Sequence, residues 1–117
     1  MDVDERPNPG EAPAAYAERL AREKAAAGAV RHPADLVLGA DTIVVIDDLI
    51  LGKPGDDDDA RRMLRVLSGR AHDVLTAVAV ARPGRGLESR IEKTRVWFLE
   101  LSDADLDALV RYMQSLR

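Results

Sequence analysis

Hydrophobic and polar positions change their spacing along the chain, which predicts helices alternating with strands. Residues 13–27 are rich in Ala, Glu, Arg and Lys, and Tyr16 and Leu20 recur on one face at helical spacing. Pro13 suits the first turn of a helix, where its missing N–H costs nothing, and Gly28 is expected to end it. The first predicted element is therefore a helix over residues 13–27.

Two short apolar runs, residues 36–39 and 43–46, have the length of buried strands. Asp47 and Asp48 then predict a tight turn into a third apolar run at residues 49–51. We therefore expect two short strands, separated by residues 40–42, and a small hairpin.

A second helix is expected after four consecutive aspartates at residues 56–59, with Met63, Leu64 and Leu67 on its apolar face and Gly69 at its end. Acidic side chains at the start of a helix accept hydrogen bonds from free N–H groups and complement the helix dipole. We interpret the four aspartates in this way rather than as metal ligands.

The clearest strand pattern is the alternation at residues 74–80, where Thr76 and three valines share one face and Leu75 and two alanines share the other. A Pro/Gly-rich turn at residues 83–86 follows, and the chain is expected to return as a long strand over residues 87–99.

A last helix is predicted after Ser102, which forms a capping-box pattern with Asp105. Its apolar face consists of Leu106, Leu109, Val110 and Met113. Together these elements predict an α/β fold with a mixed sheet, hairpins and flanking helices, in one domain spanning residues 1–117.

Composition and charge exclude several classes of function. The 117 residues include no cysteine, which excludes disulfides, a thiolate zinc site and a cysteine nucleophile. A net charge of −4 and an aromatic content of 3% argue against nucleic-acid binding. No apolar run is long enough to cross a membrane, and the acidic start is unlike a signal peptide. We therefore expect a cytoplasmic domain without a nucleic-acid or membrane partner.

The most suggestive polar segment is Gly39-Ala40-Asp41-Thr42, between the two apolar runs. A carboxylate at the end of a strand points into the crevice where α/β proteins bind ligands, and magnesium takes such oxygen ligands together with phosphates. An aspartate in a turn that bonds its own backbone is the alternative, and these four residues alone favour it.

Lys53, between Gly52 and Pro54, is the second candidate, because a lysine held in a loop can pair with a phosphate. A solvated turn lysine is the alternative reading. Lys24, on the first predicted helix, is by default a solvated lysine as well. His72 and Asp73 are adjacent, but one such pair without further ligands is weak evidence for a metal site.

Four stretches, in this order, resemble the Maf family of septum-formation-type nucleoside triphosphate pyrophosphatases. They are VDERPNPGEAPAAYAERLAREKA (3–25), LVLGADTIVVIDDLILGKPGD (36–56), ARRMLRVLSGRAHDVLTAVAV (60–80) and TRVWFLELSDADLDALVRYM (94–113). The resemblance implies a partial Maf/ITPase-like fold.

The resemblance also implies roles for individual residues. Asp41 matches the proton acceptor that activates the attacking water, and it matches a metal ligand together with Glu5. Thr42 matches the position associated with base choice, in the form found in the branch that acts on dTTP and UTP. Lys24 and Lys53 match lysines that face the triphosphate. The matching run from Arg70 to Thr76, which includes His72, implies a mainly structural role.

The implied activity is hydrolysis of a nucleoside triphosphate, with dTTP or UTP expected, to the monophosphate and pyrophosphate with Mg²⁺ or Mn²⁺. Family members are commonly homodimers, so a homodimer is one assembly to expect. Two other hypotheses stay open: a catalytically impaired Maf-like domain that binds nucleotide or a partner without turnover, and an unrelated interaction module.

Two departures from the family bear on activity. The chain is expected to lack the N-terminal strand and phosphate loop, with its arginine, and the C-terminal segment that carries another lysine and a glutamine. We further expect an unpaired sheet edge near residues 36–39, where the N-terminal strand would pair.

Overall fold

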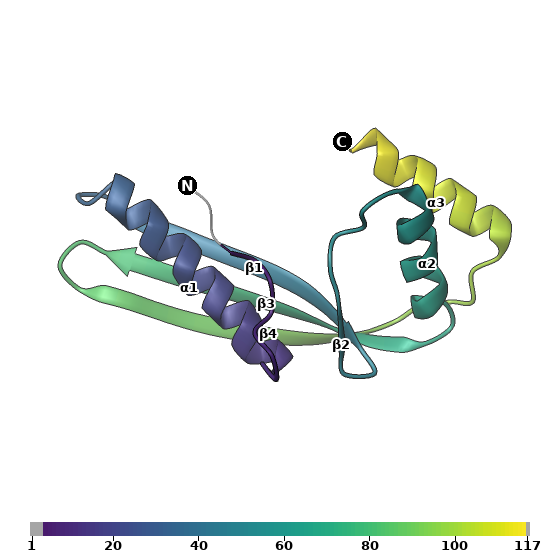
Figure 1. Cartoon of the computed structure of the whole chain (residues 1–117), viewed down its shortest axis with the longest axis horizontal. Coiled ribbons are helices and arrows are strands. Elements are labelled where there is room, and N and C mark those ends of the chain that lie inside the picture. Colours follow the sequence, from purple (N-terminus) through teal and green to yellow (C-terminus); the bar gives the residue numbers. More distant parts are fainter. Residues whose placement is uncertain (1–3, 117) are drawn as a thin grey trace.

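The computed structural model describes residues 4–116, which form three helices and four strands (Figure 1). In chain order they are α1 (Pro13–Arg31), β1 (Val37–Ile46), β2 (Leu49–Leu51), α2 (Asp57–Leu67), β3 (Ala71–Arg82), β4 (Gly86–Trp97) and α3 (Asp103–Ser115). The predicted α/β class is confirmed.

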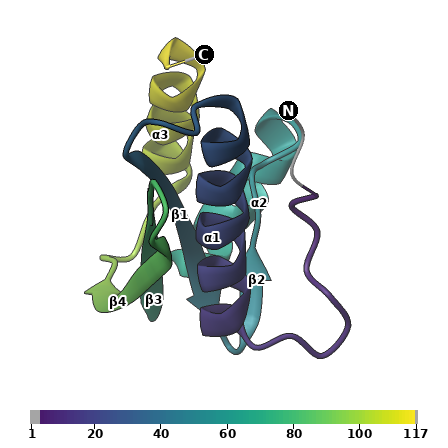
Figure 2. The ribbon, with the colours of Figure 1, turned by 90° about the vertical axis from the view of Figure 1, so that its left-hand side faces the viewer.

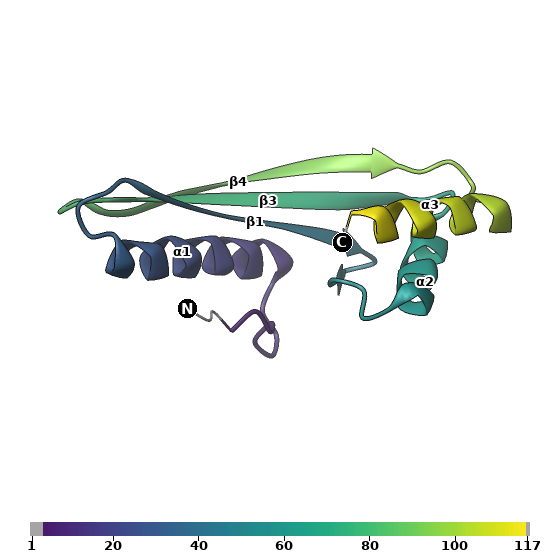
Figure 3. The ribbon, with the colours of Figure 1, turned by 90° about the horizontal axis from the view of Figure 1, so that it is seen from above.

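The strands form one sheet in the order β2-β1-β3-β4, and every pairing is antiparallel. The expectation of a mixed sheet is therefore wrong for the described residues. Figure 3 shows the long strands running side by side, with α1 along one face and the α2–α3 pair at one end. The molecule measures 52 × 28 × 23 Å as a result.

The strand β1 is continuous, which corrects the expectation of two short strands. Residues 37–45 pair without a break with β3, so Asp41 lies opposite Ala77 inside the sheet and not in a turn or at a strand end. The turn falls at Asp47 and Asp48, as predicted, and both have positive φ angles of 52° and 61°. Aspartate is one of the few non-glycine residues that tolerate this conformation.

Small residues let α1 approach the sheet closely, and Figure 2 shows the helix lying over it. The buried helix residues include three alanines, and the facing positions of β3 carry a leucine and alanines: Ala17, Ala21, Ala25, Leu75, Ala77 and Ala79. Of the two predicted faces of β3, the one with Leu75 is thus the covered face.

The helix α1 also runs past Gly28 to Arg31, so the predicted end at Gly28 is wrong. A Cβ added at Gly28 would lie 2.6 Å from Val37 Cγ1. Close packing against the start of β1, and not helix termination, therefore explains the glycine.

Both outer sides of the sheet lack a strand partner within residues 4–116, and β2 itself is an edge strand. The short β2 pairs only with residues 44–46 of β1, which leaves residues 37–43 open on that side. The outer side of β4 is open along its whole length. The expected unpaired edge near residues 36–39 is therefore present in the described part of the chain. No helix in this part is long and apolar enough to cross a membrane.

Candidate functional site

Asp41 lies near the middle of β1 with its side chain on the face covered by α1. Side chains alternate along a strand, and Ile43 and Val45, which share this face, are buried. The Asp41 side chain is 12% exposed. The fold therefore places a carboxylate between a sheet and a helix, where a charge needs a partner.

Lys24 of α1 supplies that partner. Its Nζ lies 3.0 Å from Asp41 Oδ1 and 3.2 Å from an oxygen of Glu5. Burial opposes the charged form of Lys24, but hydrogen bonds to Asp41 and Glu5, and the charges of the two carboxylates, raise its pKa above the usual value. The lysine therefore stays protonated and joins two carboxylates that are distant in the sequence.

The second carboxylate oxygen of Asp41 has no such contact. Oδ2 is buried and has no hydrogen-bond partner among the described residues. A buried charged oxygen without a partner is costly, so it marks a place where a proton, a cation or a ligand hydrogen bond would be favourable.

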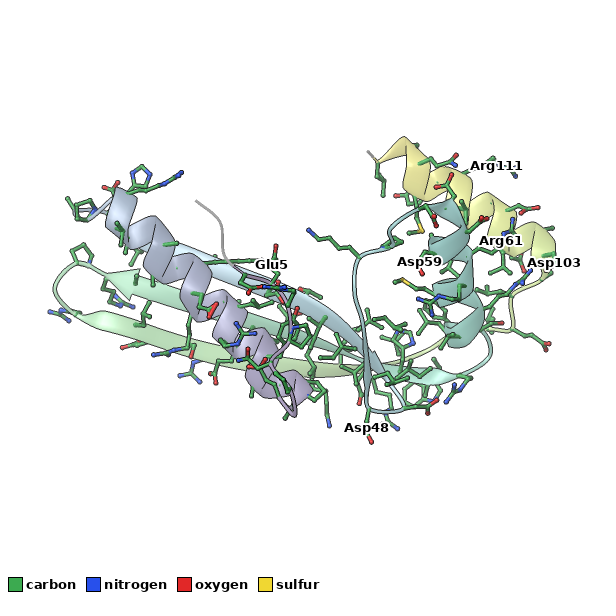
Figure 4. The ribbon with its side chains drawn as sticks, viewed as in Figure 1. Glu5, Asp48, Asp59, Arg61, Asp103 and Arg111 are labelled. Carbon is green, nitrogen blue, oxygen red and sulfur yellow. The ribbon has the colours of Figure 1, made fainter. Side chains whose placement is uncertain are left out.

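Glu5 belongs to an irregular segment, residues 4–12, that passes beside α1. Figure 4 shows Glu5 next to this helix, far from Arg61 and Asp103 on the α2–α3 pair. The Tyr16 hydroxyl donates a hydrogen bond to the carbonyl of Glu5, and Arg19 donates one of 3.0 Å to the carbonyl of Arg6. Sequence reasoning placed Tyr16 on a helix face and did not single out Arg19.

A cavity of about 610 Å³ opens beside the three charged groups. Its lining includes residues from the irregular segment, α1, β1 and the loop after β2, among them Glu5, Tyr16, Asp41, Thr42 and Lys53. Lys53 is exposed and makes no ion pair among the described residues. The structure thus brings Glu5, Lys24 and Asp41 into direct contact and places Lys53 on the wall of the same cavity.

Thr42 differs from the other predicted site residues, because adjacent residues of a strand point to opposite faces. It lines the cavity, but its side chain is exposed on the face away from α1, where its hydroxyl lies 3.3 Å from that of Thr76. Thr42 and Thr76 are paired residues of β1 and β3. The hydroxyl pair was not anticipated from the sequence.

Glu5 and Asp41 have the number and the chemical type of ligands that a magnesium or manganese ion can use. Within residues 4–116 there is no group of three or more His, Cys, Asp or Glu side chains that could hold a metal. Mg²⁺, however, often binds through one or two carboxylates and completes its shell with water and substrate phosphates. Glu5 and Asp41, with its unpartnered Oδ2, provide such a pair.

The other polar candidates have structural roles. Asp56 caps α2 by accepting a 2.8 Å hydrogen bond from the Asp59 N–H, as the capping interpretation predicts. Arg70 forms a 2.6 Å ion pair with Asp47 and so ties the start of β3 to the β1–β2 turn. His72 is buried, and its ring meets that of Phe98 edge to face at 4.8 Å between centroids.

The protein is thus of the α/β class: an antiparallel sheet is covered by one long helix, and two carboxylates and a lysine gather beside an open cavity. Comparison with known families identifies the family within this class. A family model described as "Maf-like protein" matches residues 1–117, and the chain belongs to the Maf family.

Several curated relatives share about half of their matched residues with this chain. A dTTP/UTP pyrophosphatase of Shewanella oneidensis is 54% identical over 114 residues, covering 93% of this chain and 57% of the relative. Proteins of the same name from Anaeromyxobacter dehalogenans and Chromobacterium violaceum are 53% and 50% identical, and the matches cover 54% and 58% of those proteins. The chain thus spans little more than half the length of these relatives.

Proposed function

We propose that the protein hydrolyses dTTP or UTP to the nucleoside monophosphate and pyrophosphate. The observation that carries the proposal is the contact of Lys24 with both Glu5 and Asp41 beside the 610 Å³ cavity. The relatives described above are named for the same activity, which supports the choice of substrate. The reaction is thus assigned to this cavity.

In this proposal Asp41 is the proton acceptor. A water oxygen bonds to the α-phosphorus, the bond from that phosphorus to the oxygen bridging to the β-phosphate breaks, and pyrophosphate leaves with the bond's electron pair. The proton released by the water passes to Asp41, whose Oδ2 has no hydrogen-bond partner among the described residues. The position of Asp41 between sheet and helix keeps this oxygen away from bulk solvent.

The two lysines have separate roles. Lys53 extends from the loop after β2 without an ion-pair partner in the described chain, so its ammonium is free to bind a phosphate oxygen. Lys24 already forms ion pairs with Glu5 and Asp41 before substrate arrives. We assign it to the triphosphate as well, as the family resemblance implies.

Glu5 and Asp41 would hold a Mg²⁺ or Mn²⁺ ion. When bound, such an ion supplies positive charge against the charge on the phosphate oxygens. Thr42 would contribute to the choice of base, and its hydroxyl is fixed by the contact with Thr76.

The test is to incubate the purified protein with a panel of nucleoside triphosphates, with and without Mg²⁺ or Mn²⁺, and to measure pyrophosphate. We expect metal-dependent release that is fastest with dTTP or UTP. Release that is independent of metal would contradict the proposal. Nucleotide binding without hydrolysis would instead support the alternative of a catalytically impaired Maf domain.

A further inference from the structure

Glu5 is the one member of the Lys24 contact that no helix or strand carries. It lies in residues 4–12, which we name the N-terminal strap and which have no regular secondary structure. Its side chain is 51% exposed, and its one ion pair among the described residues, to Lys24, is 3.2 Å long. Exposed ion pairs contribute little, so Lys24 alone does not hold Glu5 at the cavity.

The strap is held at its backbone by Tyr16. The side chain of Tyr16 comes from α1, is 7% exposed and donates its hydroxyl hydrogen to the carbonyl of Glu5 itself. Burial, followed by the charges of Asp41 and Glu5, raises the pKa of Tyr16, so the hydroxyl keeps its proton. This hydrogen bond fixes the backbone from which the Glu5 side chain starts.

Arg19, one turn further along α1, holds the next points of the strap. It donates to the carbonyl of Arg6 at 3.0 Å and to the carboxylate of Glu11 at 2.8 and 3.0 Å. Glu11 in turn accepts a hydrogen bond of 3.0 Å from the N–H of Asn8. The guanidinium also lies 5.5 Å from the centre of the Tyr16 ring. One face of α1 thus fastens the strap over a span that includes Glu5.

We infer that Tyr16 and Arg19 are positioning residues that hold the Glu5 carboxylate beside Asp41 and thereby set the affinity of the site for a divalent cation. The inference rests on the proposed function for the use of that cation. It concerns binding, however, and is tested on the metal alone. Partners that orient a metal ligand typically change metal affinity 10–100-fold when they are removed.

The test variant is Tyr16→Phe, which keeps the buried ring and removes only the hydroxyl. Mn²⁺ binding is measured without nucleotide, by titration calorimetry or by the electron paramagnetic resonance signal of free Mn²⁺. We expect about tenfold weaker binding, at the lower end of that range. Tyr112→Phe is the matched control, because Tyr112 lies on α3 and is 61% exposed, and it should bind Mn²⁺ as the wild type does.

A double-mutant cycle separates positioning from a general loss of structure. Glu5→Gln should weaken Mn²⁺ binding by itself, and adding Tyr16→Phe to it should cause no further loss, because Tyr16 acts through Glu5. Arg19→Met is a second variant, which removes the hydrogen bonds of Arg19 to the strap. It should weaken Mn²⁺ binding in the wild type and cause no further loss in Glu5→Gln. The melting temperature of each variant shows that it is folded.

The outcomes are distinct. Unchanged Mn²⁺ affinity in Tyr16→Phe, an equal loss with and without Glu5, or no Mn²⁺ binding by the wild type at millimolar concentration would each overturn the inference. If the wild type binds Mn²⁺ and the cycle behaves as expected but no nucleotide is hydrolysed, the positioning role stands and the proposed reaction fails.

Discussion

Gly39 of β1 and Ala21 of α1 are in backbone contact. A Cβ added at Gly39 would lie 2.4 Å from the carbonyl oxygen of Ala21 and 2.5 Å from the nitrogen of Ala25. Neither atom belongs to a side chain that could turn away. Lys24 lies between Ala21 and Ala25 on α1, and Asp41 lies two residues after Gly39 on β1. The glycine therefore sets the distance between the helix and the strand that carry the site.

Gly39→Ala should therefore destabilise the fold and disturb the site. Overpacking of a closed core usually costs about 1–3 kcal/mol, and here the clash is with backbone. Urea denaturation measures the loss. Gly52→Ala is the control, since no atom lies within 4 Å of a Cβ at that position. Equal midpoints for Gly39→Ala and the wild type would show that α1 packs less tightly than described.

Asp41→Asn tests the proton acceptor. The amide keeps the size of the side chain but cannot accept a proton, so we expect pyrophosphate release to fall about 10²–10⁴-fold. Asp48→Asn is the matched control, because Asp48 is exposed in the β1–β2 turn and asparagine tolerates its positive φ. Equal rates for Asp41→Asn and the wild type would remove Asp41 from the mechanism.

Lys53→Met should weaken substrate binding without affecting stability. A hydrogen bond to a charged group contributes about 1.5–3 kcal/mol, which corresponds to a KM for the triphosphate at least tenfold higher. The melting temperature should not change, since Lys53 is exposed and makes no ion pair among the described residues. Lys93→Met, on the exposed part of β4, should change neither quantity. A lower melting temperature with an unchanged KM would assign Lys53 to the fold.

His72 should make the stability depend on pH. Burial lowers the pKa of His72, and the neighbouring Asp73 only partly opposes this effect. In the unfolded chain a histidine takes up its proton near pH 6.5, so between the folded pKa and about pH 6.5 the unfolded state binds more protons. The free energy of unfolding therefore has its full value above about pH 6.5 and decreases as the pH falls below about 6.5.

Urea midpoints between about pH 5 and 7 check this expectation, since carboxylates ordinarily titrate below that range. His72→Gln should flatten the pH dependence, whereas replacing the exposed His32 by Gln should leave it intact. A slope that survives in His72→Gln would assign the titration to another group.

The local features of the fold could be predicted from the sequence because their partners are close along the chain. Ser102 and Asp105 form the expected capping box, with hydrogen bonds of 2.9 and 3.1 Å between positions three residues apart. The alternation of residues 74–80 likewise corresponds to β3, since a strand with one covered face repeats every two residues.

The predictions for Gly28 and Gly39 are wrong for the same reason. Gly28 and Gly39 suggested a helix end and a turn, whereas both make room for a neighbouring element. That requirement arises only when α1 packs on β1, and no local sequence pattern indicates this packing. The contact of Tyr16 with Glu5 was missed in the same way, because it joins a helix to an irregular segment with no sequence period. The family resemblance implied a shared metal site for Glu5 and Asp41, but the contact of Lys24 with both carboxylates was not predicted.

The two open sides of the sheet differ in their side chains, and this has a consequence for self-association. The outer strand β4 carries charges of alternating sign, Glu88, Arg90 and Glu92, which hinder the addition of a further strand. Residues 37–43 of β1 include the 66% exposed Leu38 and no lysine or arginine. Aggregation of this chain at high concentration should therefore start at β1, and a charged residue in place of Leu38 should raise its solubility limit.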